Sequence, residues 1–365
     1  MDYRERWQQR RRKEARRNYT AGAAVLAVLL AVIGLVRMHR DGRPLWCSQF
    51  QQTCPIYFTP SSSLLYCALP AGEAVALRLD NGRRAWKKVL LQPDSFGAPP
   101  GVSEPLVVLG DDGGRVTAYH ASSATPVWQF CAQGPVRSPL LISGGVVFFG
   151  SDGGQIHALE LASGRELWRY EAGAPVDCGA VLCNGVLVVG AMDGSILGIE
   201  AGTGTRRWDF KVGASVTATP ALISGQVIVG ADNGTVYQLD PMTGRATAKA
   251  DVPESGLIRS APVVDASRVY VATTDGWLMA MERTALGRVW SRKLGREISA
   301  GPAIDDTYLY CATGEAEVLA IDKKTGRLRR RWDCPARVQG SLVALQGMVV
   351  ASTADGQVIA FRTSP

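Results

Sequence analysis

The sequence predicts an all-β fold, an eight-bladed β-propeller of four-stranded blades, preceded by a single transmembrane helix. Three observations predict it. Tryptophan recurs about every 41 residues, two series of glycine turns follow the same period, and an uncharged apolar segment lies near the N-terminus. Such short repeats cannot bury a core alone and must stack on one another. We therefore divide the chain into a basic tail at 1–19, an apolar anchor at 20–37 and the propeller at 41–365.

The apolar segment 20–36, TAGAAVLAVLLAVIGLV, contains no charged side chain and is about 17 residues long, near the lower limit for crossing the hydrocarbon core. A cleaved signal peptide is one alternative, but the residues from Arg37 to Asp41 are bulky and charged where cleavage needs small side chains. A buried core helix is another, and the Arg-rich flanks argue against it. We expect an uncleaved membrane anchor.

The charge of the N-terminal region predicts the orientation of this anchor. Eight basic residues precede the apolar segment, and Arg37, Arg40 and Arg43 follow it. This bias predicts a cytoplasmic tail and a single-pass protein of the inner (cytoplasmic) membrane whose propeller is periplasmic or extracellular. Residues 1–40 hold ten basic and three acidic residues, which accounts for the whole net charge of +7. Residues 41–365 are therefore neutral, and we expect no nucleic-acid partner.

Tryptophan marks one strand of each repeat. Seven of the nine tryptophans are separated by 40, 42, 40, 40, 82 and 42 residues, and Ala248 fills the double gap in an otherwise matching unit. A residue repeated once per blade on the outer strand is typical of the core between blades. The seven are Trp46, Trp86, Trp128, Trp168, Trp208, Trp290 and Trp332.

Glycine turns separate the predicted strands, because a tight hairpin needs residues that tolerate positive φ. Four short strands in about 41 residues correspond to one propeller blade. The turn before the tryptophan strand contains Gly42, Gly82, Gly164, Gly204, Gly244, Gly287 and Gly326, with Ala124 replacing glycine once. The preceding turn contains Gly72, Gly114, Gly154, Gly194, Gly234, Gly276 and Gly356, with Ala316 as the exception.

The two series are out of phase at the ends of the chain. The propeller begins with a lone tryptophan strand, DGRPLW, and ends with a unit that lacks one. We therefore expect residues 43–47 to supply the outer strand of the blade made by 338–362, which closes the ring and removes an open sheet edge. The closing strand would also keep the propeller close to the bilayer.

These repeats resemble the PQQ-like repeat family, whose units end in Ala-x-Asp-x-x-Thr-Gly-x-x-x-Trp. Here that pattern appears as AIDKKTGRLRRRW, ALELASGRELW and QLDPMTGRATA. The resemblance covers nearly all of 41–365, and the repeat number is similar to that of BamB-like propellers, which are scaffolds of the outer-membrane barrel assembly machinery. It implies a propeller without catalytic chemistry. An apolar anchor replaces their lipidated cysteine, which puts outer-membrane attachment in doubt and favours a partner in the inner membrane.

Catalytic and cofactor sites find little support. Quinoprotein dehydrogenases resemble this repeat but have longer insertions, catalytic acids, a Ca²⁺ site and often adjacent cysteines. The regular spacing and the lack of a Cys-Cys pair therefore predict no PQQ cofactor. A C-x-x-C-H haem site is absent, and only His39, His120 and His157 occur, for which we expect solvated or packing roles. We name no catalytic, cofactor-binding or metal-binding residue.

Aspartate and cysteine could each suggest a further site. Asp-Gly suits tight hairpins, so we interpret the recurring aspartates as turn residues rather than calcium ligands. Eight cysteines suit an oxidising compartment. Only Cys47–Cys54 and Cys178–Cys183 are close enough in sequence to suggest bridges, and Cys67 and Cys311 occupy equivalent strand positions, as buried thiols or as a bridge. The aspartates are Asp112, Asp152, Asp193, Asp275 and Asp355.

A rigid ring that presents loops on two faces, without a catalytic constellation, favours binding over catalysis. We expect a non-catalytic, membrane-anchored scaffold or partner-binding subunit of an envelope or inner-membrane protein complex. Its partner would be a protein complex or an envelope-assembly factor contacted through the blade loops. The alternatives are a quinone-dependent redox enzyme and a sensor domain that binds a small ligand.

Overall fold

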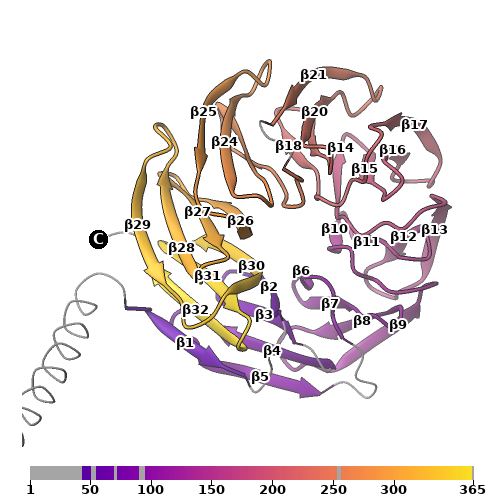
Figure 1. Ribbon diagram of the computed structural model, residues 1–365. Helices are drawn as coiled ribbons and strands as arrows, with labels where there is room; N and C mark the ends of the chain where they lie inside the picture. The colour runs from indigo at the N-terminus through magenta and orange to yellow at the C-terminus, as the bar shows by residue number, and fades with distance from the viewer. Residues whose placement is uncertain (1–42, 51–54, 70–71, 90–94, 253–255, 364–365) are drawn as a thin grey trace, which may run out of the picture. The chain divides into compact units, whose positions relative to one another are not determined.

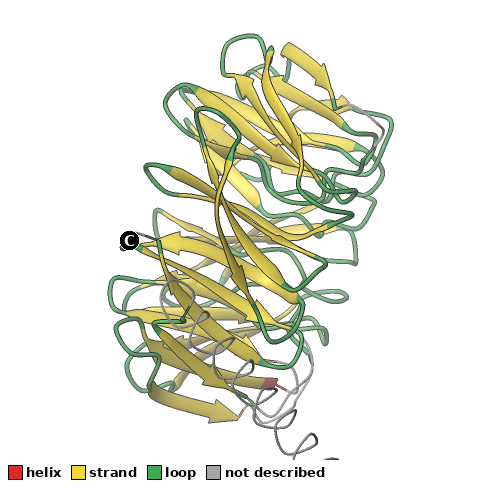
Figure 2. Cartoon of the chain, turned by 60° about the vertical axis from the view of Figure 1, so that its left-hand side comes forward, coloured by secondary structure: helices red, strands yellow, loops and turns green. Residues whose placement is uncertain are grey.

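A computed structural model describes residues 43–50, 55–69, 72–89, 95–252 and 256–363. The described residues form 32 strands in eight antiparallel sheets of four strands each, arranged around a central axis within residues 45–364 (Figure 1). Figure 2 shows the loops gathered at the ends of the strands. The predicted eight-bladed propeller with four-stranded blades is confirmed.

In seven blades the four strands follow one another in chain order, from the inner strand to the outer strand. Blades 1 to 4 comprise β2 (Tyr57–Pro60), β3 (Leu64–Leu69), β4 (Glu73–Arg78) and β5 (Arg84–Val89); β6 (Gly101–Ser103), β7 (Leu106–Gly110), β8 (Arg115–His120) and β9 (Pro126–Cys131); β10 (Leu141–Ser143), β11 (Val146–Gly150), β12 (Gln155–Glu160) and β13 (Glu166–Glu171); β14 (Ala180–Cys183), β15 (Val186–Gly190), β16 (Ser195–Glu200) and β17 (Arg206–Lys211). Blades 5 to 8 comprise β18 (Ala221–Ile223), β19 (Gln226–Gly230), β20 (Thr235–Leu239) and β21 (Ala246–Asp251); β22 (Val263–Val264), β23 (Arg268–Ala272), β24 (Trp277–Glu282) and β25 (Arg288–Lys293); β26 (Ile298–Ile304), β27 (Tyr308–Thr313), β28 (Glu317–Asp322) and β29 (Leu328–Asp333); β30 (Val338–Leu345), β31 (Met348–Thr353), β32 (Gln357–Arg362) and β1 (Trp46–Gln49).

Burial changes from the middle to the outside of each blade. In blade 4, every residue of β15 is buried and only the last residue of β16 is not, because both faces of these strands pack against neighbouring blades. The outer strand β17 instead alternates between exposed and less exposed side chains. Apolar runs therefore mark the middle strands, and alternation marks the rim.

The tryptophan of one blade packs on a turn glycine of the next. Trp208 Nε1 donates a hydrogen bond to the Pro241 carbonyl at 2.8 Å, and a Cβ at Gly244 would lie only 2.5 Å from the indole ring. The predicted role of the tryptophans in the core between blades is thus confirmed at this seam. The same ring-on-glycine contact joins Trp46 to Gly82, Trp128 to Gly164, Trp168 to Gly204 and Trp290 to Gly326.

Two predicted repeat positions in blades 6 and 7 are wrong by one or two residues. Arg330, not Trp332, pairs opposite Ala320, the register position that tryptophan takes in every other blade except blade 5, where Ala248 takes it. Trp332 lies two residues further along the strand and stacks on Phe361 of blade 8, with 5.7 Å between ring centroids. In blade 6 the left-handed turn position belongs to Leu286 with φ 54°, not to Gly287. Pairing with the preceding strand sets the register, and letter spacing alone missed it.

Ring closure follows the prediction. β1 pairs antiparallel with β32, with Trp46 opposite Ala360, and supplies the outer strand of blade 8. On the inner side, the Phe58 amide of blade 1 donates to Ser341 Oγ of blade 8 at 3.0 Å. Blade 8 therefore combines strands from both ends of the propeller.

The blade connections define two faces of the ring. On one face lie the turns between second and third strands and the links between blades, which hydrogen-bond to each other, as the Asp152 amide does to the Pro135 carbonyl. We call it the mouth face. On the opposite face lie the other turns, joined for example by the Leu161 amide and the Gly145 carbonyl, and there β1 begins. We call it the β1 face.

The predicted tail at 1–19 and the predicted anchor at 20–37 lie outside the described residues. Within the part of the chain that the structure describes, no helix has the length and apolar character needed to cross a membrane.

Candidate functional site at the channel mouth

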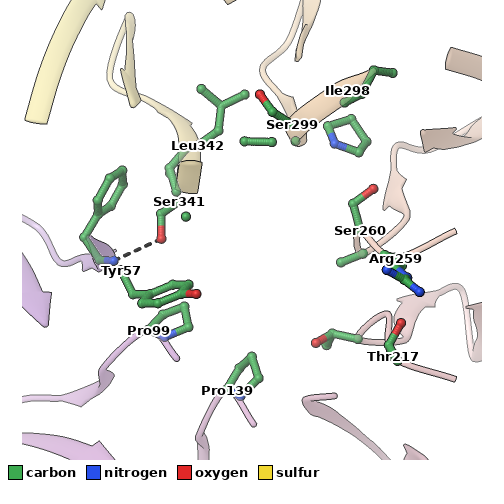
Figure 3. Close-up of a pocket in the computed structure, with 18 of the residues that line it drawn as sticks. Tyr57, Pro99, Pro139, Thr217, Arg259, Ser260, Ile298, Ser299, Ser341 and Leu342 are labelled. Atoms are coloured by element: carbon green, nitrogen blue, oxygen red, sulfur yellow. Dashed lines mark hydrogen bonds between the residues drawn. The ribbon is translucent and has the colours of Figure 1, made fainter. Parts of the chain in front are cut away.

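A cavity of about 720 Å³ lies at the centre of the ring, and all eight blades line it. Figure 3 shows Tyr57, Pro139, Thr217, Arg259 and Ser299 around the open space, each from a different blade. The cavity walls come from the inner strands and from the segments that lead into them. In blades 1 to 6 the inner strand has four residues or fewer, and neighbouring blades supply adjacent residues to one wall.

One repeated segment builds the wall of this cavity. In each blade a buried apolar residue stands just before the inner strand or at its first position. In blades 1 to 7 the next residue lines the cavity, because successive side chains point to opposite sides of an extended chain. The buried set is Ile56, Phe96, Val136, Val176, Val216, Ile258, Ile298 and Val338, none more than 8% exposed. The lining set is Tyr57, Gly97, Arg137, Asp177, Thr217, Arg259 and Ser299.

The lining residue of blade 3, Arg137, joins two blades at the mouth face. Its Nε donates to Asp112 Oδ1 at 2.9 Å, and its Nη1 donates to Asp152 Oδ2 at 2.5 Å. Asp112 belongs to the turn of blade 2 and Asp152 to the turn of blade 3. Arg137 is 45% exposed, so solvent and a binding partner can both reach the guanidinium.

Asp152 also faces Asp177, the lining residue of blade 4. Oδ1 of each carboxyl is buried and has no hydrogen-bond partner among the described residues. Burial and the neighbouring carboxyl group of Asp152 together raise the pKa of Asp177 to about 6, against the opposing charge of Arg137. Asp177 is therefore protonated at mildly acidic pH.

Further around the mouth, charged groups of blades 5 to 8 also pair with each other. Arg259 Nε donates to Asp232 Oδ2 at 3.3 Å, and Thr217 Oγ1 donates to Asp232 Oδ1 at 3.3 Å. Arg337 forms an ion pair with Glu297. The mouth thus presents fixed groups of both signs, which can recognise complementary polar and charged groups on a partner.

The described channel residues do not fit the Ca²⁺ and quinone pair that the resemblance associates with dehydrogenases. Among the residues that the structure describes, no three His, Cys, Asp or Glu side chains are arranged to share one metal ion. The neighbouring carboxyl groups of Asp152 and Asp177 face Arg137.

The predicted aspartate series divides into two kinds of position. Asp193 Oδ1 accepts a hydrogen bond from the Ser195 amide at 3.0 Å, the turn role that was predicted. Asp112 and Asp152 instead stand one residue earlier relative to the positive-φ glycine, and their side chains pair with Arg137. These two aspartates do lie in turns, but their side chains bind Arg137 and not a nearby backbone amide as predicted. The signal in the sequence was the doubled glycine that follows each of them.

His157 has the packing role that the sequence predicted. It is buried, its ring stacks on Phe149 at 4.9 Å between centroids, and its Nδ1 lies 2.9 Å from Glu166 Oε1. Burial lowers the pKa of His157, against the hydrogen bond to Glu166. His120 is exposed, and His39 lies outside the described residues.

The suggested Cys178–Cys183 bridge is wrong, because both thiols are free and buried. Cys178 Sγ donates to the Gly190 carbonyl and accepts from the Gly190 amide, both at 3.2 Å. Ser138 Oγ makes the same pair of hydrogen bonds with Gly150 in blade 3. Cys178 is therefore a repeat position that ties the inner strand to the next one.

The other described cysteines are also free thiols. Burial raises the pKa of both Cys67 and Cys311 well above the usual range of a thiol. These two are the buried thiols that the sequence allowed, not a bridge. Cys47 is free and exposed, and Cys54, its suggested partner, lies outside the described residues.

Residues 70–191, 192–293 and 287–364 match the protein family described as outer membrane protein assembly factor BamB. The outer membrane protein assembly factor BamB of Burkholderia pseudomallei (strain K96243) is 33% identical over 118 residues, which make up 31% of this chain and 29% of that protein. The aligned part of this chain spans less than a third of the length of the curated relatives it matches.

Solved structures share the fold. BamB from Moraxella catarrhalis superposes with a TM-score of 0.77 at 19% identity, over 88% of this chain and 99% of that chain. A quinohemoprotein alcohol dehydrogenase from Pseudomonas putida HK5 superposes with a TM-score of 0.72 at 12% identity, over 88% and 76% of the two chains. At such identities the likeness shows a common architecture and leaves the choice between binding and catalysis to the site.

Proposed function

This chain belongs to the PQQ-like repeat family described as outer membrane protein assembly factor BamB, and from that premise we propose that it is a non-catalytic scaffold subunit of an envelope or inner-membrane protein complex. Residues 20–37 anchor it in the inner membrane as a single span. The tail at 1–19 stays in the cytoplasm, and the propeller lies in the periplasm or outside the cell. Its partner is a protein, either a membrane complex or an envelope-assembly factor.

The charged mouth of the channel carries this proposal. Arg137 and Arg259 each hold a carboxylate of a blade turn in place, and both side chains remain about half exposed, at 45% and 58%. A partner therefore meets charged groups whose positions the ring has already fixed, which reduces the entropy lost on binding. The surrounding ring is rigid because every blade is tied to the next through its seams.

A partner-capture experiment tests the proposal on the full-length chain in mild detergent, with mass spectrometry of what is recovered. We compare Arg259→Ala with Arg165→Ala on the β1 face. The two arginines match closely: each is exposed, at 58% and 64%, and each pairs with one carboxylate, at 3.3 and 3.4 Å.

We expect Arg259→Ala to recover roughly tenfold less partner, as for an interface arginine, and Arg165→Ala to recover the normal amount. Recovery of the chain alone from wild-type membranes would contradict the scaffold role. Loss of the partner in Arg165→Ala alone would place the interface on the β1 face.

The cavity favours a second candidate, a sensor domain for a small ligand. Its volume of about 720 Å³ lies within the usual range of small-molecule sites. Thermal-shift measurements against glycans and small metabolites separate the two roles, because a sensor is stabilised by its ligand and the scaffold is not. Adding PQQ and Ca²⁺ to the same assay, with an absorbance spectrum of the purified chain, tests the quinone-dependent enzyme.

A further inference from the structure

Basic charge is unevenly spread over the outer strands. β25, β29, β1 and β5, of blades 6, 7, 8 and 1, carry net charges of +3, +2, 0 and +3, which is +8 together. β9, β13, β17 and β21, of blades 2 to 5, carry 0, −1, +2 and 0, which is +1 together. The first four strands follow one another around the ring (Figure 1). We call their outward surface the basic rim.

Ion pairs neutralise only part of the basic rim. Of its nine Lys and Arg side chains, Lys87, Lys293, Arg329 and Arg331 pair with carboxylates. The other five have no ion pair within the described ranges. Arg292 and Arg330 donate to backbone carbonyls, which fixes their positions without cancelling their charge. The five are Arg84, Lys88, Arg288, Arg292 and Arg330.

The outer strands of blades 2 to 5 offer a contrast. They hold five Lys and Arg side chains, of which Arg206, Arg207 and Lys211 pair with carboxylates. Arg169 and Lys249 are the two without an ion pair among the described residues. The same structural position thus leaves few free cations there and many on the basic rim.

The basic rim also contains the strand by which the chain joins its proposed anchor. Only residues 38–44 separate the proposed anchor at 20–37 from Leu45, and seven residues span at most about 25 Å. Exposed apolar side chains stand among the cations: Leu45, Val289 and Leu328 are 42%, 40% and 46% exposed. Cations mixed with apolar side chains are the combination that binds the headgroup layer of an anionic bilayer.

We propose that the basic rim lies against the anionic phospholipid headgroups of the membrane that holds the anchor, an inference that rests on the proposed membrane attachment. Charge complementarity and the short tether both favour a lipid surface as the occupant. Blades 6, 7, 8 and 1 then face the bilayer. The channel axis runs parallel to the membrane, and the mouth face stays open to the partner.

Hydrogen exchange with mass spectrometry tests this on the full-length chain in nanodiscs. One set contains phosphatidylcholine alone, and the other contains phosphatidylcholine with phosphatidylglycerol. Contact with headgroups slows exchange of the outer-strand amides that face away from the ring. We expect exchange in β25, β29 and β5 to be on the order of fivefold slower in the anionic discs, with β9 and β13 unchanged between the two lipids.

Matched charge-removal variants complete the test. Arg288→Gln combined with Arg292→Gln removes two unpaired cations of the basic rim, and Arg169→Gln combined with Lys249→Gln removes the two unpaired cations of the opposite outer strands. The first pair is expected to abolish most of the lipid-dependent protection of β25, and the second to leave it intact. Exposed surface substitutions of this kind leave the fold in place.

The outcomes separate this inference from the proposed function. Equal exchange of β25, β29 and β5 in both lipids overturns it, and so does protection of β9 and β13 instead. Protection that is equally strong in phosphatidylcholine discs and in detergent indicates contact with protein and also overturns it. Peptides from 20–37 report on the anchor in the same experiment: if they exchange freely while the rim protection still depends on anionic lipid, the anchor is wrong and the basic rim stands.

Discussion

The buried contacts between neighbouring blades, the seams, and the mouth of the channel use adjacent residues of each repeat. The residue type repeats from blade to blade at the seams and changes from blade to blade at the mouth. At the seam, buried apolar residues such as Val136, Val176 and Val216 recur with almost no change. One residue further on, the mouth has a different chemical group in nearly every blade: Arg137, Asp177 and Thr217 are consecutive. A position whose residue type repeats is therefore followed directly by a position whose residue type does not.

Packing geometry explains the difference. Each seam must fill the same space, because a Cβ on Gly150 would lie 2.2 Å from Val176 and one on Gly190 2.2 Å from Val216. The lining residue meets an open cavity, so its size and charge are free to vary without disturbing the blades. Repeated positions therefore report on the ring, and the residues beside them report on its use. Four sets of variants test this contrast.

Trp208→Ala should have the largest effect, because it empties a seam. The indole is 9% exposed, fills the space over Gly244 and donates to Pro241. We expect a loss of about 3–5 kcal/mol in the free energy of unfolding, measured by chemical denaturation. Val127→Ala, on an outer strand with a 40% exposed side chain, should change it by less than about 0.5 kcal/mol. Equal losses would contradict the role of the seam.

Gly244→Ala and Gly213→Ala separate backbone strain from the seam contact. Both glycines have positive φ, 69° and 75°, but only Gly244 has a neighbour within 4 Å of an added Cβ, the Trp208 ring. Gly213→Ala should cost about 1–2 kcal/mol from the left-handed backbone alone. Gly244→Ala should cost about 2 kcal/mol more, because the indole must shift. Equal unfolding midpoints for the two variants would contradict a stabilising contact between Trp208 and Gly244.

Asp177→Asn tests the mouth, and its effect should depend on pH. The folded-state pKa of about 6 lies above the ordinary aspartate value of 3.8, so the folded protein holds this proton more tightly than the unfolded chain. The resulting stability is complete below pH 4 and is lost as the pH rises through 6. Asparagine carries no charge, so the variant should be more stable than wild type by about 1 kcal/mol at pH 7.5, after solvent screening, and similar at pH 4. A difference that does not change with pH would contradict the carboxyl pair.

Cys178→Ser should have the smallest effect, because Ser138 already makes the equivalent hydrogen bonds in blade 3. We expect a change below about 0.5 kcal/mol, whereas Cys178→Ala loses both hydrogen bonds and should cost about 1–2 kcal/mol. Denaturation with and without a reducing agent should give the same midpoint for wild type. A midpoint that falls on reduction would restore a bridge at this position.

Most of the fold could be predicted because the same residue types recur at each contact between blades. Trp46 and Gly82 are both visible in the sequence, and the unpaired tryptophan strand at one end predicted its partner at the other. The errors came where the marker residue lies at another position of the repeat while the strand pairing stays the same. At Arg330 the guanidinium takes the register position of the indole and donates to the Arg362 carbonyl at 3.3 Å, so the blade keeps its register while Trp332 moves.

The site could not be predicted in the same way, because its groups do not repeat. Arg137 gains its role only from two carboxylates on separate turns, and Asp152 and Asp177 are 25 residues apart in the chain. Aligning the repeats on the buried apolar residue would have put Arg137, Asp177 and Arg259 in one column. This aligned position identifies the residues that line the mouth. Which charged groups pair with each other depends on how neighbouring blades are placed in the folded ring.

The closure of blade 8 sets a timetable for synthesis. Trp46 and Ala360 pair across 314 residues of chain, the difference between their numbers. At roughly 5–20 residues per second, the ribosome needs about 15–60 seconds to make the partner of β1 after β1 itself has emerged. Until then β1 has an unpaired edge, and blade 8 is not complete enough to hold Trp46 against Gly82 of blade 1. The ring therefore closes only after β32 has been made. A chain whose synthesis stops earlier keeps the edge of β1 exposed.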